Sequence, residues 1–199
     1  MILNIALGVV AGLMYLFLFW RHLKDDYVSN QIFTTGFFTI AFIAIVAYLS
    51  QLLVSTLWFW LCIVAVGVST FVNSYRFRRR KIEVAEAQVV GLMPALALLY
   101  LASYFADQDI KNIAGFGIVL LLFILFFVFN NSYKRFSWYR SGRVGFAGFA
   151  TLGFLFLARA IVAINFPFMI SFVGALEIYS SLVASVTAFA VLIYLARQT

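Results

Sequence analysis

The feature that most constrains this chain is a succession of apolar runs, each about as long as a helix that crosses a membrane. A transmembrane helix needs about 20 predominantly apolar residues, and the 199-residue sequence contains seven such runs. They lie at residues 2–20, 32–53, 57–75, 84–104, 113–129, 144–164 and 168–195. Few residues remain between them. The sequence therefore predicts a single all-α membrane domain over residues 1–199, a polytopic seven-transmembrane-helix bundle.

The composition agrees with a membrane domain. Hydrophobic residues make up 65% of the chain and charged residues 11%, whereas soluble domains contain about 45–50% and about 25%. A soluble domain of this length has too little interior to bury so many large apolar side chains. The composition therefore argues against a soluble globular protein, and the 24 Phe residues are typical of helices that face lipid.

The basic residues predict how the chain is oriented. Twelve of the 14 Lys and Arg residues follow the first, third, fifth and seventh runs: Arg21, Lys24, Arg76, Arg78, Arg79, Arg80, Lys81, Lys134, Arg135, Arg140, Arg143 and Arg197. Short loops rich in Lys and Arg stay in the cytoplasm. The pattern predicts an N-terminus outside and a C-terminus inside, as in a multi-pass protein of the bacterial plasma (inner) membrane. These loops account for the net charge of +7, so no nucleic-acid partner is expected.

The first and last runs need separate interpretation. The first lacks the basic start and the small-residue cleavage site of a signal peptide, so it is predicted to be a retained span. The last run is about 28 residues long, more than a bilayer requires. Either it tilts strongly, or residues 166–174, which contain Pro167, form a re-entrant or interfacial piece before the true span. We favour the second interpretation.

Arg159 is the residue most indicative of a site, because it lies inside the sixth apolar run. An arginine at mid-span costs about 2.5–3.5 kcal/mol on insertion scales, so it usually faces a bundle interior, a cavity or a partner. Glu177 is the acid inside the next run and is expected at a similar depth. The two residues either hold an anionic head group that enters from the outer leaflet, or pair to hold two helices. Arg159 could also extend to the outer interface.

Other candidate groups are few. His22 is the one histidine and Cys62 the one cysteine, so the sequence predicts no disulfide within the chain, no metal site and no cofactor. Two sets of glycines predict close helix packing, Gly8 with Gly12, and Gly145 with Gly148 and Gly153.

Two segments of the chain resemble a known family. The first runs from residue 75 through the basic stretch 76–81 to Glu86 and Pro94. The second, residues 140–159, begins with RSGRVGF and ends with GFLFLAR. In this order they resemble the bacterial prolipoprotein diacylglyceryl transferases, which have a basic loop, an acid and a proline opening the next helix, and a basic-glycine entry to a sixth span that contains a required arginine.

The resemblance implies an activity and a site. Members of the family have seven spans with the N-terminus outside, and they transfer diacylglyceryl from phosphatidylglycerol to the cysteine thiol of a lipoprotein precursor. Arg159 matches the required arginine, which implies a catalytic residue that binds the phosphate and stabilises the departing glycerol phosphate. The predicted substrate-binding residues are Arg159, Glu177 and Arg143. The predicted partners are a phosphatidylglycerol-like membrane phospholipid and lipoprotein precursors.

The sequence also departs from the family pattern. Residues 58–62 (WFWLC) stand in place of a His-Gly-Gly, residues 99–105 (LYLASYF) lack the arginine of a Gly-Arg-x-Gly-Asn-Phe signature, and Ala163 stands where an acid is expected. These differences keep a second function open, a non-catalytic lipid-binding or scaffold membrane protein of the cell envelope. A transporter is disfavoured, because the spans show no internal repeat and few polar residues.

Overall fold

A computed structural model shows a helical chain, and it describes residues 2–77, 81–133, 145–166 and 172–197. Over these residues the elements are α1 (Ile2–Leu23), α2 (Ser29–Leu53), the 3-10 helix η1 (Ser55–Leu57), α3 (Trp58–Phe77), α4 (Lys81–Asp107), α5 (Ile110–Ser132), α6 (Phe146–Asn165) and α7 (Leu176–Arg197). By length and composition, seven helices in this part of the chain are able to cross a membrane. The predicted all-α fold with seven long apolar helices is confirmed.

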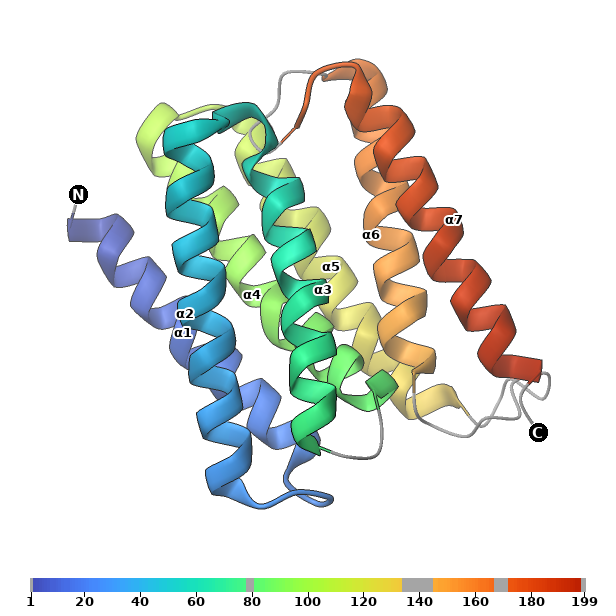
Figure 1. The fold of residues 1–199 in the computed structure, drawn as a ribbon. Coiled ribbons are helices and arrows are strands. Elements are labelled where there is room, and N and C mark those ends of the chain that lie inside the picture. The colour runs from blue at the N-terminus through green and yellow to red at the C-terminus, as the bar shows by residue number, and fades with distance from the viewer. Residues whose placement is uncertain (1, 78–80, 134–144, 167–171, 198–199) are drawn as a thin grey trace.

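The seven helices run alternately up and down (Figure 1). The C-terminal ends of α1, α3, α5 and α7 lie at one end of the bundle, here called the Arg197 end; the opposite end, where α4 meets α5, is the Asp107 end. Helix α4 packs against α1, α3, α5 and α6, while α7 packs along α6 and α2 along α3. The core therefore forms around α4.

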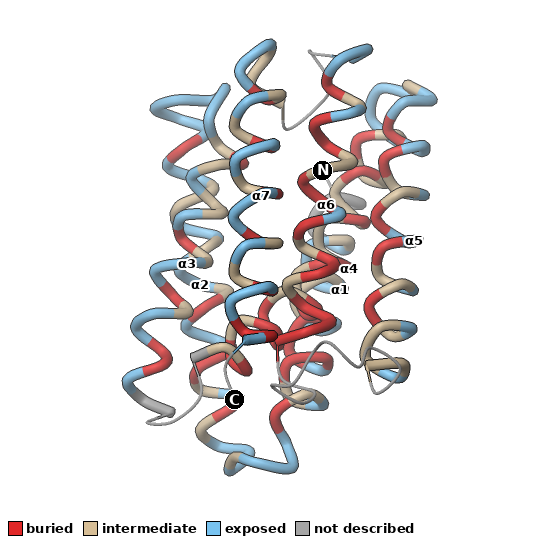
Figure 2. The backbone as a smooth tube through the Cα atoms, turned by 90° about the vertical axis from the view of Figure 1, so that its right-hand side faces the viewer, coloured by how far each residue is buried: buried red, intermediate tan, exposed pale blue. Residues whose placement is uncertain are grey.

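Much of the surface of the helices is apolar. Large apolar side chains are exposed on all seven helices, among them Phe38 and Leu53, which are 66% and 78% exposed. Figure 2 shows buried positions facing inward and exposed positions facing outward along the helices. Soluble monomers rarely expose large contiguous apolar patches. In a membrane these side chains would contact lipid instead of water. The exposed apolar residues and the lengths of the helices therefore both indicate a membrane protein.

Two of the predicted glycine contacts occur and two do not. A Cβ placed on Gly148 would lie 2.8 Å from Glu86 Cγ, and one on Gly153 would lie 2.7 Å from the Phe189 ring. These glycines therefore let α6 approach α4 and α7 closely. A Cβ on Gly8 or Gly12 would meet no atom within 4 Å, so neither position of the GxxxG pair in α1 is closely packed against another described helix.

Buried hydroxyls and amides also join helices inside the bundle. Asn73 of α3 donates from Nδ2 to Thr39 Oγ1 at 2.9 Å and to Ser69 Oγ at 3.1 Å, and the two hydroxyls lie 2.8 Å apart. Thr70 Oγ1 donates to Gln88 Oε1 of α4 at 2.6 Å. Such side-chain hydrogen bonds typically hold helices together where lipid surrounds them.

The last helix begins after residue 174, as in the favoured interpretation of the last apolar run. Helix α7 begins at Leu176, eight residues after the start of the predicted run at residue 168. Residues 172–175 are not helical, and Gly174 has a φ of 54°, a left-handed conformation that glycine adopts readily. The proposed re-entrant or interfacial piece at 166–174 falls largely on residues 167–171, outside the described residues.

Candidate functional site

Arg159 and Glu177 come together where α6 and α7 meet near the Asp107 end. Arg159 lies six residues before the last residue of α6, and Glu177 lies in the first turn of α7. The two helices are antiparallel neighbours joined at this end (Figure 1). The chain therefore places both side chains at the same depth, as their positions in the two runs predict.

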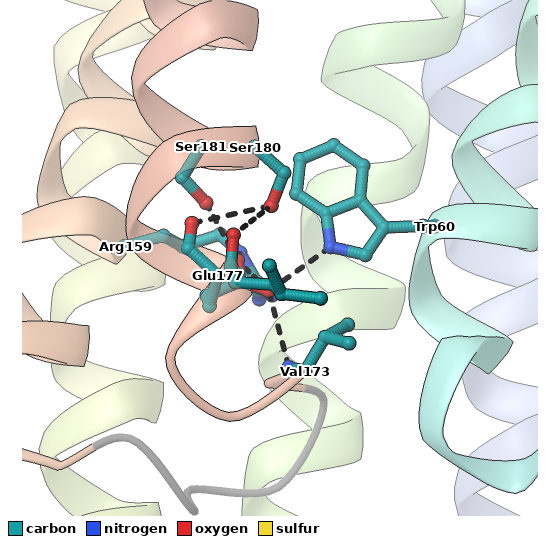
Figure 3. Close-up of polar contacts among 7 residues, drawn as sticks. Trp60, Arg159, Val173, Glu177, Ser180 and Ser181 are labelled. Atoms are coloured by element: carbon teal, nitrogen blue, oxygen red, sulfur yellow. Dashed lines mark hydrogen bonds and ion pairs between the residues drawn. The ribbon is translucent and has the colours of Figure 1, made fainter.

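The two side chains form a buried ion pair (Figure 3). Arg159 Nη2 lies 2.7 Å from Glu177 Oε1, and Arg159 Nε–H donates to the same oxygen at 2.9 Å. The exposed fraction is 4% for Arg159 and 0% for Glu177. A charge in this position is tolerated because its partner neutralises it and supplies short, charge-assisted hydrogen bonds.

The carboxylate of Glu177 is held by three further donors. Ser181 Oγ donates to Oε1 at 2.6 Å, one turn along α7. Trp60 Nε1–H of α3 donates to Oε2 at 3.0 Å, and the Val173 backbone N–H donates to the same atom at 3.4 Å. Glu177 therefore connects α3, α6 and the segment before α7 through a single carboxylate.

Aromatic rings cover the guanidinium group. Arg159 Cζ lies 3.6 Å from the ring centroid of Phe59 and 4.8 Å from that of Phe172, distances at which a cation and an aromatic ring attract each other. Next to this group, the Trp60 ring stacks on Phe156 with centroids 5.6 Å apart. The cavity that Arg159 helps to line measures about 30 Å³, which is room for a few water molecules.

Sequence reasoning found the two charged residues and missed their aromatic and hydroxyl partners. Trp60 lies 117 residues from Glu177 in sequence, and its place at the start of an apolar run is also typical of a ring at the membrane interface. Ser181 could have been recognised, because it lies four residues after Glu177 on the same helix face. The third predicted site residue, Arg143, lies outside the described residues.

The carboxylate of Glu86 in α4 is also buried, and it accepts hydrogen bonds from backbone N–H groups at the start of α6. Glu86 Oε2 accepts from the Gly145 N–H at 2.8 Å, and Oε1 accepts from the Gly148 N–H at 2.9 Å. Helix N-termini favour negative charge, because their first N–H groups have no partner within the helix. His22 Nε2 lies 3.8 Å from Glu86 Oε2, beyond direct hydrogen-bond distance.

Glu86 and His22 line a polar cavity of about 470 Å³ at the Arg197 end. Its described lining comes from α1, α4, α5 and the loop after α1, and it includes Arg21, Asp25, Glu83 and Asn130. Within the described residues, no group of three or more His, Cys, Asp or Glu residues is placed to hold a metal ion. The described lining of the cavity presents charged and amide groups.

Comparison with known proteins adds no relative. No protein-family model, curated protein or solved structure matches this chain. Fold and site together define a class, a chain of seven apolar helices able to be integral in a membrane, with one aromatic-lined ion pair buried near one end.

Proposed function

We propose that this chain is a non-catalytic lipid-binding or scaffold membrane protein of the bacterial cell envelope. The observation that carries the proposal is that Arg159 is buried and already paired with Glu177. Its guanidinium group is bound to Glu177 and lies 3.6 and 4.8 Å from the centroids of two aromatic rings, and the residue is 4% exposed. An arginine that binds the phosphate of a substrate needs N–H groups and space facing that substrate, and the cavity beside Arg159 measures about 30 Å³.

Releasing Arg159 for a lipid phosphate would leave Glu177 buried without its cationic partner. Separating a buried pair in this way costs about 3–5 kcal/mol, which the phosphate contact would first have to offset. The predicted phosphatidylglycerol site relied on Arg159, Glu177 and Arg143. Two of these residues bind each other, and the third lies outside the described residues. We therefore assign the pair a structural role between α6 and α7.

The proposal includes an orientation, with the Arg197 end in the cytoplasm of a bacterial inner membrane and the N-terminus outside. The support is the distribution of charge. Helices α1, α3, α5 and α7 all end at the Arg197 end (Figure 1), and twelve of the 14 Lys and Arg residues follow those helices or lie in their last turns. Short basic loops are retained in the cytoplasm. The ion pair then lies toward the outer leaflet.

Diacylglyceryl transfer to a lipoprotein cysteine is the second candidate function. The observation that favours it is the contact between the two segments that carry the family resemblance. Glu86, in the first segment, accepts hydrogen bonds from Gly145 and Gly148 in the second. The two segments thus meet in space as parts of one functional unit would, and the cavity at Glu86 is large enough for a ligand.

One experiment separates the two functions. The chain is expressed in bacteria depleted of their own diacylglyceryl transferase, and the mass of a reporter lipoprotein is measured. We expect no added diacylglyceryl mass, although the chain is present in the membrane fraction at the level of a transferase control that restores the modification. A reporter that gains the diacylglyceryl mass would overturn the proposal and establish the second function.

A further inference from the structure

The N-terminal half of helix α1 forms a lateral groove with α4. This groove is separate from the Arg159–Glu177 pair and from the cavity at Glu86. The groove measures about 350 Å³ and runs toward the Asp107 end. Its walls are mainly small or apolar side chains, including Leu7, Gly8 and Ala11 of α1 and Ala95 and Ala102 of α4. A Cβ placed on Gly8 would meet no atom within 4 Å. The hollow therefore results from small residues on facing helices.

The groove is apolar along its length and acidic at one end. Ser103, a polar residue in its wall, donates its hydroxyl to the Leu99 carbonyl oxygen at 3.0 Å, so this hydroxyl is satisfied within α4. Asp107, the last residue of α4, is exposed and also lines the groove. A ligand of the groove therefore combines an apolar body with a group that is attracted to a carboxylate.

The nearby cation does not neutralise Asp107. Lys111 Nζ lies 3.7 Å from Asp109 Oδ2 and 5.6 Å from the centroid of the Phe166 ring. Among the described residues, no ion pair engages Asp107. The acidic end of the groove is thus complementary to a cationic head group, and it would repel an anionic one.

We propose that this groove binds one acyl chain of a phospholipid whose head group carries a primary amine, with the ammonium group on Asp107. The volume is that of a small-molecule pocket, whereas a transmembrane helix is about 10–12 Å across with its side chains and would not enter the groove. The inference rests on the proposed placement in a membrane and names the lipid for the proposed lipid-binding function.

The test uses the full chain in nanodiscs that contain phosphatidylethanolamine and phosphatidylglycerol in equal amounts, with retained lipid measured by native mass spectrometry. We expect wild type to retain phosphatidylethanolamine several-fold over phosphatidylglycerol. Asp107→Asn should abolish this preference. Asp26→Asn, at the opposite end of the bundle, is the matched control, because it also removes one exposed carboxylate and lies outside the described groove lining; it should retain the preference.

A second pair of variants tests the groove itself. Gly8→Leu should fill the hollow and reduce retention of phosphatidylethanolamine, whereas Gly12→Leu should not, because Gly12 has equally open surroundings but does not belong to the described lining. Equal retention of the two lipids by wild type, or an unchanged preference in Asp107→Asn, would overturn the inference. A dimer that Gly8→Leu dissociates and Gly12→Leu does not would also overturn it, since a helix would then occupy the groove. None of these outcomes depends on the lipoprotein assay.

Discussion

At the scale of single residues, the buried pair explains how an arginine is accommodated inside an apolar bundle. Arg159 gives two N–H groups to one oxygen of Glu177, while Ser181, Trp60 and Val173 donate to the same carboxylate. Each charge is stabilised by the other and by neutral dipoles around it. Removing one partner therefore has a larger effect than removing both.

We predict strong coupling between the two positions in a double-mutant cycle. Arg159→Leu and Glu177→Leu should each lower the free energy of unfolding by about 3–5 kcal/mol, because each leaves a buried charge without its partner. The double variant should cost less than either single variant. Thermal unfolding of the purified protein in one detergent measures this, with Arg197→Leu, at an exposed position, as the control. Additive single effects would contradict the pairing.

Trp60 gives a second prediction at this scale. Trp60→Phe removes the indole N–H donor but leaves a ring to stack on Phe156. We expect a loss of about 1–3 kcal/mol in the free energy of unfolding, the usual cost of removing one partner of a buried hydrogen bond. Trp58→Phe is the control, since Trp58 also contacts an aromatic ring, that of Phe59, but is not among the described donors to Glu177. Equal losses in the two variants would show that ring size, not the hydrogen bond, matters.

At the scale of elements, a glycine allows two helices to approach closely only where its missing side chain would meet the neighbouring helix. Gly148 lies against the Glu86 side chain and backbone, at 2.8 and 3.1 Å from a placed Cβ, whereas Gly117 of α5 has no atom within 4 Å. Both residues lie inside helices, so their intrinsic helix propensities are equal. Their substitution by alanine should therefore have opposite effects.

We expect Gly148→Ala to destabilise the protein by about 1–3 kcal/mol, because overpacking moves α6 away from α4. Gly117→Ala should be neutral or stabilise it by up to about 1 kcal/mol, since alanine favours the helix more than glycine does. Unfolding followed by circular dichroism compares the two variants. A stabilising Gly148→Ala would mean that α4 and α6 are not in close contact there.

The elements also show how far the sequence predicts this structure. The number of long helices and their approximate positions follow from the hydrophobic length that a bilayer requires. The start of α7 at Leu176 agrees with the favoured interpretation of the last run. Residues 168–175 are nearly all apolar, however, so neither the non-helical residues 172–175 nor the left-handed φ of Gly174 follows from the sequence pattern. Composition carries no such backbone information.

The candidate site was predictable only in part. Arg159 and Glu177 are the charges in adjacent apolar runs, so their meeting could be expected as one of two alternatives. The ring faces of Phe59 and Phe172 and the N–H of Trp60 come from other parts of the chain. Contacts between such distant residues depend on how the helices pack, which hydrophobic periodicity does not specify.

At the scale of the whole molecule, the bundle has two chemically different ends. The Arg197 end has a polar cavity with Glu86 and His22, and the Asp107 end has the buried ion pair and the apolar groove. Basic loops follow the helices at the Arg197 end. Placement of these ends on opposite sides of a membrane underlies both the proposed function and the proposed lipid site.

Cysteine accessibility in intact cells tests this placement most directly. In a Cys62→Ser background, single cysteines replace Lys111 at the Asp107 end and Asp25 at the Arg197 end, and both positions are exposed. We expect a membrane-impermeant maleimide to label the Lys111→Cys variant in intact cells and the Asp25→Cys variant only after permeabilisation. Labelling of Asp25→Cys in intact cells, with Lys111→Cys protected until permeabilisation, would contradict the orientation and the account that depends on it.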